Sequence, residues 1–117
     1  MTMPLRITYH GLEGSEAIEG AIRERAEKLP QFFDRIQDCR VVVEVPHRSH
    51  KKGNQFQVKV DLVVPGEEMV VTKDVQAGHP HEDLFVVIRD AFDALERQLE
   101  SYAAKQSGGA RRHAALR

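Results

Sequence analysis

The sequence predicts a two-layer α+β domain in which a four-stranded sheet carries two helices on one face. Three observations support this prediction: four segments alternate apolar and polar residues as half-buried strands do, two segments repeat apolar residues every three or four positions, and the elements follow the order β-α-β-β-β-α. The chain has 117 residues, 41% of them hydrophobic and 30% charged, which suits one core. We therefore expect one domain over residues 1–106, followed by a basic tail.

The N-terminal part predicts one strand and one helix. Residues 5–9 (LRITY) alternate apolar and polar side chains, the period of two expected for a strand with one buried face. Residues 16–29 carry an apolar residue at every third or fourth position. Ser15 can cap the N–H groups at the start of this helix, and Pro30 lacks the N–H that would continue it. The helix should therefore end just before the proline.

Three further strands are predicted over residues 39–45, 55–64 and 69–75, which are rich in β-branched residues. The first two should pair as an antiparallel hairpin, because only a short polar loop separates them. Pro65-Gly66 has the composition of a turn and should connect the last two strands.

The second helix is predicted from the longest periodic segment. From Asp83, which can cap the helix, apolar residues recur every three or four positions over about five turns. Gly108-Gly109 should end this helix and leave residues 107–117 as a flexible basic tail. Both helices should cover the apolar face of the sheet, because that face needs burial.

The charges are segregated along the chain, although the formal net charge is only −1. Residues 46–60 contain four basic and no acidic residues, and residues 105–117 also contain four basic and none acidic. Residues 61–104, in contrast, contain three basic and ten acidic residues. A nucleic-acid partner is compatible with this pattern, because it needs a contiguous basic surface rather than a basic average.

The composition argues against a membrane or secreted protein. No stretch approaches the roughly 18 apolar residues of a membrane span, and the N-terminus lacks a basic segment followed by an apolar run. Cys39 is the single cysteine and opens an apolar strand, so we expect a small buried side chain rather than a reactive thiol. A cytoplasmic location fits these features.

Neither a metal site nor catalysis is favoured. The histidines form two loose pairs, His47/His50 and His79/His81, whose spacing is not diagnostic of a metal site and which lack a cysteine partner. No nucleophile stands beside a base, and no glycine-rich phosphate motif occurs. We therefore expect no catalytic residue, no metal, no cofactor and no small-molecule substrate.

RNA binding remains open from the residues alone. The order α-β-β-β-α from residue 16 onward is also that of double-stranded-RNA-binding domains, which contact the sugar-phosphate backbone by shape. In that layout the segment VPHRSHKKGNQF (45–56) occupies the position of the hairpin loop, so Arg48, Lys51 and Lys52 could contact phosphate. A solvated loop explains the same residues, and a shared topology does not establish a function.

Three short motifs resemble the short ribosome hibernation factors. They are HEDLF (81–85), LERQL (95–99) and GGARR (108–112), in this order. The family includes hibernation-promoting factor and ribosome-associated inhibitor A, also called sigma-54 modulation or ribosomal subunit interface proteins. The resemblance covers roughly residues 4–112 and includes the order of the elements.

This resemblance implies a non-enzymatic, stress-linked protein that binds the small ribosomal subunit near the decoding centre and blocks the mRNA and tRNA sites. Basic side chains on the two helices of such proteins contact ribosomal RNA, and the matching positions that keep the charge are Arg25, Lys28 and Arg97. Off the ribosome we expect a monomer. Further candidates for RNA contact are Arg89 on the second helix, Arg48, Lys51 and Lys52 in the loop, and Arg111 and Arg112 in the tail.

The second helix departs from the family pattern. Ala94 and Ser101 stand where relatives tend to carry lysine, and the same helix carries four acidic residues between positions 90 and 100. The loop lysines and the tail could compensate for the missing charge. An alternative is a protein-interaction module that uses the acidic face of this helix or an edge of the sheet, without RNA.

Overall fold

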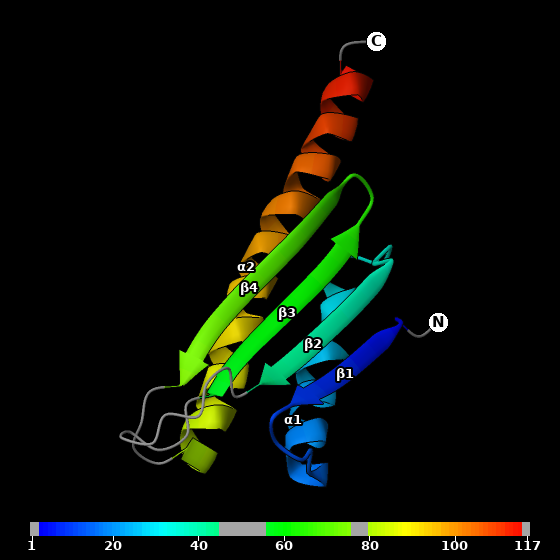
Figure 1. Ribbon diagram of the computed structural model, residues 1–117. Coiled ribbons are helices and arrows are strands. Elements are labelled where there is room, and N and C mark those ends of the chain that lie inside the picture. The colour runs from blue at the N-terminus through cyan, green and yellow to red at the C-terminus, as the bar shows by residue number, and fades with distance from the viewer. Residues whose placement is uncertain (1–2, 45–55, 76–79, 116–117) are drawn as a thin grey trace.

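The fold follows the predicted order of elements. The computed structural model describes residues 3–44, 56–75 and 80–115. The elements are β1 (Leu5–His10), α1 (Glu16–Ala26), the 3₁₀ helix η1 (Leu29–Gln31), β2 (Asp38–Glu44), β3 (Phe56–Val64), β4 (Glu67–Val75) and α2 (Pro80–Ala115). The four strands form one sheet, and both helices cover the same face of it (Figure 1). The predicted α+β class and the two-layer arrangement are confirmed.

The sheet is mixed, and its strands lie in sequence order. β1 pairs in parallel with β2, with Leu5 opposite Cys39, because α1 returns the chain to the starting edge before β2 begins. β2 and β3 pair antiparallel, as predicted, and β3 and β4 form a second antiparallel pair. β1 and β4 are therefore the two edge strands.

The core lies between the sheet and the two helices, as the alternation of the strands predicts. On β2 and β3 every second residue is buried, and these residues face the apolar stripe of each helix. Among the described residues, no polar or charged residue is fully buried. The largest fully buried side chains include Phe92, Ile22, Leu29, Leu62, Met69, Leu84, Ile88, Leu95 and Leu99.

The start of α1 is confirmed, but its end is earlier than predicted. Ser15 Oγ accepts a hydrogen bond of 3.1 Å from the Ile18 N–H, as expected of a capping serine. The helix ends at Ala26 rather than at residue 29, and a 3₁₀ turn begins at Leu29. The reason is Pro30, whose ring would clash with the carbonyl of Ala26 four residues earlier in a continued α-helix.

The turn between β3 and β4 is tied to α2. Pro65 and Gly66 form its centre, and Gly66 has a φ of 78°, a conformation that suits glycine at the second central position of a type II turn. The Tyr102 hydroxyl donates a hydrogen bond of 2.6 Å to the Pro65 carbonyl. The Tyr102 ring also packs edge-on against Phe33, with ring centroids 5.0 Å apart. Tyr102 thereby connects the last buried turn of α2 to the sheet.

α2 is longer at both ends than predicted. It begins at Pro80, so Asp83 lies inside its first turn and is not the cap; proline suits the first helical position because its missing N–H would have no partner there. The helix then passes through Gly108-Gly109 to Ala115, so the predicted break is wrong. Each glycine costs about 1 kcal/mol relative to alanine, but good helix formers flank the pair. Figure 1 shows α2 extending past the end of the sheet. The flexibility of residues 107–117 stays a prediction.

Candidate nucleic-acid interface

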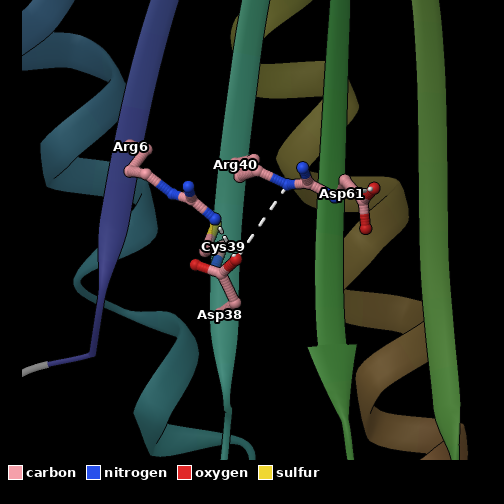
Figure 2. Close-up of polar contacts among 5 residues, drawn as sticks. All are labelled: Arg6, Asp38, Cys39, Arg40 and Asp61. Carbon is pink, nitrogen blue, oxygen red and sulfur yellow. Dashed lines mark hydrogen bonds and ion pairs between the residues drawn. The ribbon is translucent and has the colours of Figure 1, made fainter.

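Both arginines on the open face of the sheet, opposite the helices, are paired with carboxylates. Arg6 on β1 lies 2.6 Å from Asp38 on β2, and Arg40 lies 3.2 Å from Asp61 on β3. Arg40 also lies 4.0 Å from Asp38, so the two arginines converge on one carboxylate (Figure 2). Because carboxylates already neutralise these guanidinium groups, Lys59 is left as an isolated basic residue on this face, which therefore does not offer a contiguous basic surface to RNA.

The same face has an excess of acid towards β4. Asp61 and Glu68 lie on neighbouring strands, and a hydrogen bond with Asp61 and the repulsion by its charge raise the pKa of the Glu68 carboxyl group. One oxygen of Asp61, Oδ1, is buried without a hydrogen-bond partner among the described residues. Two adjacent carboxyl groups thus share one side of the sheet, which makes this region unsuitable for phosphate.

Arg25, a predicted RNA contact, is engaged inside the protein. It extends from α1 towards α2, where its Nη2 contacts the Asp93 carboxylate and lies 3.5 Å from Glu96 Oε2. Only 21% of the Arg25 side chain is exposed. Its charge is therefore neutralised by residues that are 68 and 71 positions further along the chain, which no local pattern predicts.

Lys28 and Arg89, two other predicted contacts, are exposed. Lys28 follows the end of α1 and is in none of the ion pairs between described residues. Arg89 lies 3.4 Å from its neighbour Asp90, and both side chains are at least half exposed. Such an exposed pair is weak, so a phosphate could replace the carboxylate.

Arg97 borders an open groove between α2 and the start of β4. The groove has a volume of about 460 Å³. Arg97, Ser101 and Lys105 are four residues apart and so lie on one face of α2, with about 12 Å of helix between the two basic residues. Neither Arg97 nor Lys105 is in an ion pair with a described residue. The residues that line the groove are Glu67, Ala94, Arg97, Gln98, Ser101, Tyr102 and Lys105.

Lys105 is the functional candidate that sequence reasoning missed. Its signal was present, because it stands one turn beyond Ser101 and two turns beyond Arg97. The groove also contains Ala94 and Ser101, the two positions where the resemblance implies lysine. The structure thus brings Arg97 and Lys105 together with Ala94 and Ser101 in one groove. Arg25 does not line this groove.

The remaining predicted contacts fall in two regions. Arg48, Lys51 and Lys52 lie outside the described residues. Arg111 and Arg112 lie within the C-terminal part of α2, of which the backbone is described. Figure 1 shows that the ends of β2 and β3 joined by the loop lie near the start of α2, whereas the C-terminal part of α2 lies at the opposite end of the molecule. The two basic segments of the sequence therefore join the fold at opposite ends.

Cys39 is a buried side chain, as predicted. It is fully inaccessible to solvent, and burial, with the nearby charges of Asp38 and Asp61, raises the pKa of its thiol to about 12. A thiol in this environment is unreactive near neutral pH, because the thiolate is the reacting species.

The part of the chain that the structure describes contains no cluster of metal ligands and no membrane-spanning helix. Within it, no group of three or more histidine, cysteine, aspartate or glutamate residues is arranged to hold a metal ion. His47, His50 and His79 lie outside this part, and His81 is described by its backbone alone. No described helix is long and apolar enough to cross a membrane.

The comparisons with known proteins show the family to which the chain belongs. Residues 5–107 match the family described as Sigma 54 modulation protein / S30EA ribosomal protein, and the chain belongs to this family. The members of this family are ribosome-associated proteins and not enzymes. The family match confirms the predicted resemblance and the prediction that the protein is not an enzyme.

Individual relatives cover nearly the whole chain. The ribosome hibernation promoting factor of Azotobacter vinelandii is 29% identical over 104 residues, which are 89% of this chain and 86% of that protein. That of Escherichia coli K12 is 30% identical over 103 residues, or 88% of this chain and 96% of that protein. The crystal structure of the Thermus thermophilus Protein Y N-terminal domain has a TM-score of 0.66 at 20% identity and covers 86% of this chain and 99% of that one, which supports the fold.

Proposed function

We propose that the chain is a ribosome hibernation factor that docks on the rRNA of the small ribosomal subunit near the decoding centre, and there blocks the mRNA and tRNA sites. The family and the names of the relatives support the ribosome as the partner. The single observation that carries the proposed contact is the groove on α2 with Arg97 and Lys105, whose charges no described residue neutralises.

The groove suits a phosphate backbone, because its two basic residues outnumber its single acidic residue, Glu67. Arg97 can donate two parallel hydrogen bonds to one phosphate, and Lys105 can meet another about 12 Å along the helix. Ser101 and Gln98 lie between them and offer further hydrogen bonds. Association is driven by release of the counterions that surround the RNA, so it weakens with salt. Inhibition then needs no chemistry, because a bound domain occupies the path of mRNA and tRNA.

Other basic residues add to this contact in the proposal. Lys28 and Arg89 extend it along the two helices. Arg48, Lys51 and Lys52, in the sequence between β2 and β3, and Arg111 and Arg112, in the C-terminal part of α2, are further proposed contacts. The protein is a monomer before it binds, and a cytoplasmic location follows from the ribosome as partner.

Co-sedimentation with isolated small subunits at several salt concentrations tests the groove. The variant Arg97→Gln/Lys105→Gln should bind more weakly. The negative slope of log affinity against log salt should become shallower by roughly 1.4 to 1.8, because each lost phosphate contact removes about 0.7 to 0.9 from its magnitude. The matched control is Arg6→Gln/Lys59→Gln, which removes the same charge from the open face of the sheet. Equal losses in both variants would reject the groove as the site, and no binding of the wild type at low salt would reject the function.

A second candidate function is a protein-interaction module, favoured by the acidic residues on the outer surface of both helices. Five glutamates between positions 13 and 27 accompany α1, against three basic residues in the same stretch up to Lys28, of which Arg25 is already neutralised. A complex with one non-ribosomal protein that survives nuclease treatment, found by pull-down, would favour this candidate. Loss of all partners after nuclease treatment would favour rRNA.

A further inference from the structure

The charged contact between the two helices is a feature that the proposed function leaves unexplained. Arg25 on α1 contacts Asp93 and Glu96 on α2 through its Nη2 atom. The exposed fraction of the side chain is 21% for Arg25, 41% for Asp93 and 18% for Glu96. The cluster therefore lies at the rim of the helix interface, where a large ligand can reach it from the side of Asp93.

The two carboxylates leave the Arg25 guanidinium only partly satisfied. Both contacts use Nη2, whereas Nε is buried and has no hydrogen-bond partner among the described residues. Arginine binds an oxyanion most strongly through two parallel N–H groups. Each of the two edges of a guanidinium that can do this includes Nη2. While Asp93 and Glu96 occupy this nitrogen, Arg25 cannot bind a phosphate in the two-bond geometry.

We propose that Asp93 and Glu96 compete with RNA phosphate for Arg25, and so determine how strongly the helical layer binds RNA. The inference rests on the proposed rRNA docking and adds the residues that set its strength. The exchange of Asp93 for phosphate costs little free energy, because Asp93 is 41% exposed and an exposed carboxylate holds an arginine weakly. A phosphate that replaces Asp93 preserves one ion pair and also releases counterions from the RNA.

A neutral variant of the more exposed acid tests the competition. Asp93→Asn keeps the shape of the side chain and should raise the affinity of the chain for isolated small subunits about two- to fivefold. The slope of log affinity against log salt should steepen by roughly 0.7 to 0.9, since Arg25 gains one phosphate contact. Glu100→Gln is the matched control, because it removes the same charge from α2 at an exposed position in no ion pair with a described residue.

A double-mutant cycle separates competition from a general change in charge. Arg25→Gln should have little effect in the wild-type background, where the acids hold the arginine, and should cancel the gain of Asp93→Asn. Glu96→Gln provides a second cycle in case Asp93→Asn impairs folding, which circular dichroism would detect. The proposal would be overturned by equal gains for Asp93→Asn and Glu100→Gln, or by a gain that persists after Arg25→Gln.

A second ligand distinguishes failure of this inference from failure of the proposed function. A short RNA duplex of unrelated sequence presents phosphates in the same A-form geometry. If no form of the protein bound the small subunit, the proposed function would fail, and the same cycle on the duplex would still decide the competition. If Asp93→Asn raises the affinity for either ligand and Arg25→Gln cancels this increase, the inference is supported. If neither ligand shows such an increase, the inference is rejected.

Discussion

Gly14, just before α1, and Gly20, within it, have opposite surroundings. A Cβ atom on Gly14 would lie 2.3 Å from Cε2 of the Tyr9 ring, closer than any real contact allows. A Cβ atom on Gly20, inside α1, would meet nothing within 4 Å. Gly14 is therefore required by the close approach of the chain to Tyr9, whereas Gly20 is a weak point of the helix.

The two glycines predict stability changes of opposite sign. Gly14→Ala should lower the free energy of unfolding by about 1 to 3 kcal/mol, because the Tyr9 ring must shift. Gly20→Ala should raise it by about 0.5 to 1 kcal/mol, because alanine restricts the unfolded chain and favours the helix. Urea denaturation of both variants measures the two changes. A destabilising Gly20→Ala would mean that the space beside α1 is not open.

The contact between Glu68 and Asp61 should make the stability of the protein depend on pH. The folded-state pKa of its carboxyl group is raised above 4.5 by Asp61, so the contribution of Glu68 to stability is present below the unfolded pKa and is lost as the pH rises through the folded pKa. Glu68→Gln removes the repulsion, and its amide can donate to the buried Asp61 Oδ1 at any pH. The variant should therefore unfold at a higher temperature than the wild type at pH 7, with a smaller difference near pH 4.

Glu67→Gln is the control for this experiment. It removes the same charge one residue away, from the opposite face of β4, where Glu67 borders the groove of α2. Thermal unfolding at both pH values compares the variants. A stabilisation by Glu67→Gln equal to that by Glu68→Gln would point to net charge rather than to the contact with Asp61.

Tyr102 helps to hold α2 on the sheet. Tyr102 donates its hydroxyl hydrogen to the Pro65 carbonyl, whereas the Tyr9 hydroxyl is buried with no hydrogen-bond partner among the described residues. Tyr102→Phe should therefore lower the free energy of unfolding by about 0.5 to 1.5 kcal/mol. Tyr9→Phe removes the same group without a partner and should be neutral or stabilising. Chemical denaturation of the pair measures this difference, and equal losses would contradict the assigned hydrogen bonds.

The ends of the helices show where local sequence patterns were sufficient to predict the structure and where they were not. Ser15 and Pro30 predicted the start and the approximate end of α1, because capping and the proline clash depend only on neighbouring residues. Gly108-Gly109 misled the prediction for α2, because the cost of glycine was weighed without the helix formers on both sides. A glycine pair lowers helix stability but does not by itself end a helix.

Over the whole molecule, the fold could be predicted from the sequence, but the surroundings of the candidate interface residues only in part. The sheet and core followed from alternating residues, since burial of one face imposes that pattern on each strand. Arg97 was predicted from the family motif, whereas Lys105 was missed although helical spacing places it two turns beyond Arg97. The partners of Arg25 depend on the packing of α1 against α2. Charge counted along the sequence could not reveal that packing neutralises Arg25 and both open-face arginines.

The parallel pairing of β1 has a consequence for the order of folding. Leu5 pairs with Cys39 across 34 positions of sequence, whereas Leu62 pairs with Met69 across seven. Closing a short loop costs less chain entropy than closing a long one, so the hairpins of β2, β3 and β4 should form early and β1 should join last. We therefore expect the late transition to be the docking of β1 and α1 onto a preformed three-stranded meander. The Arg25 contact between the helices would then be completed only when the N-terminal part of the chain has arrived.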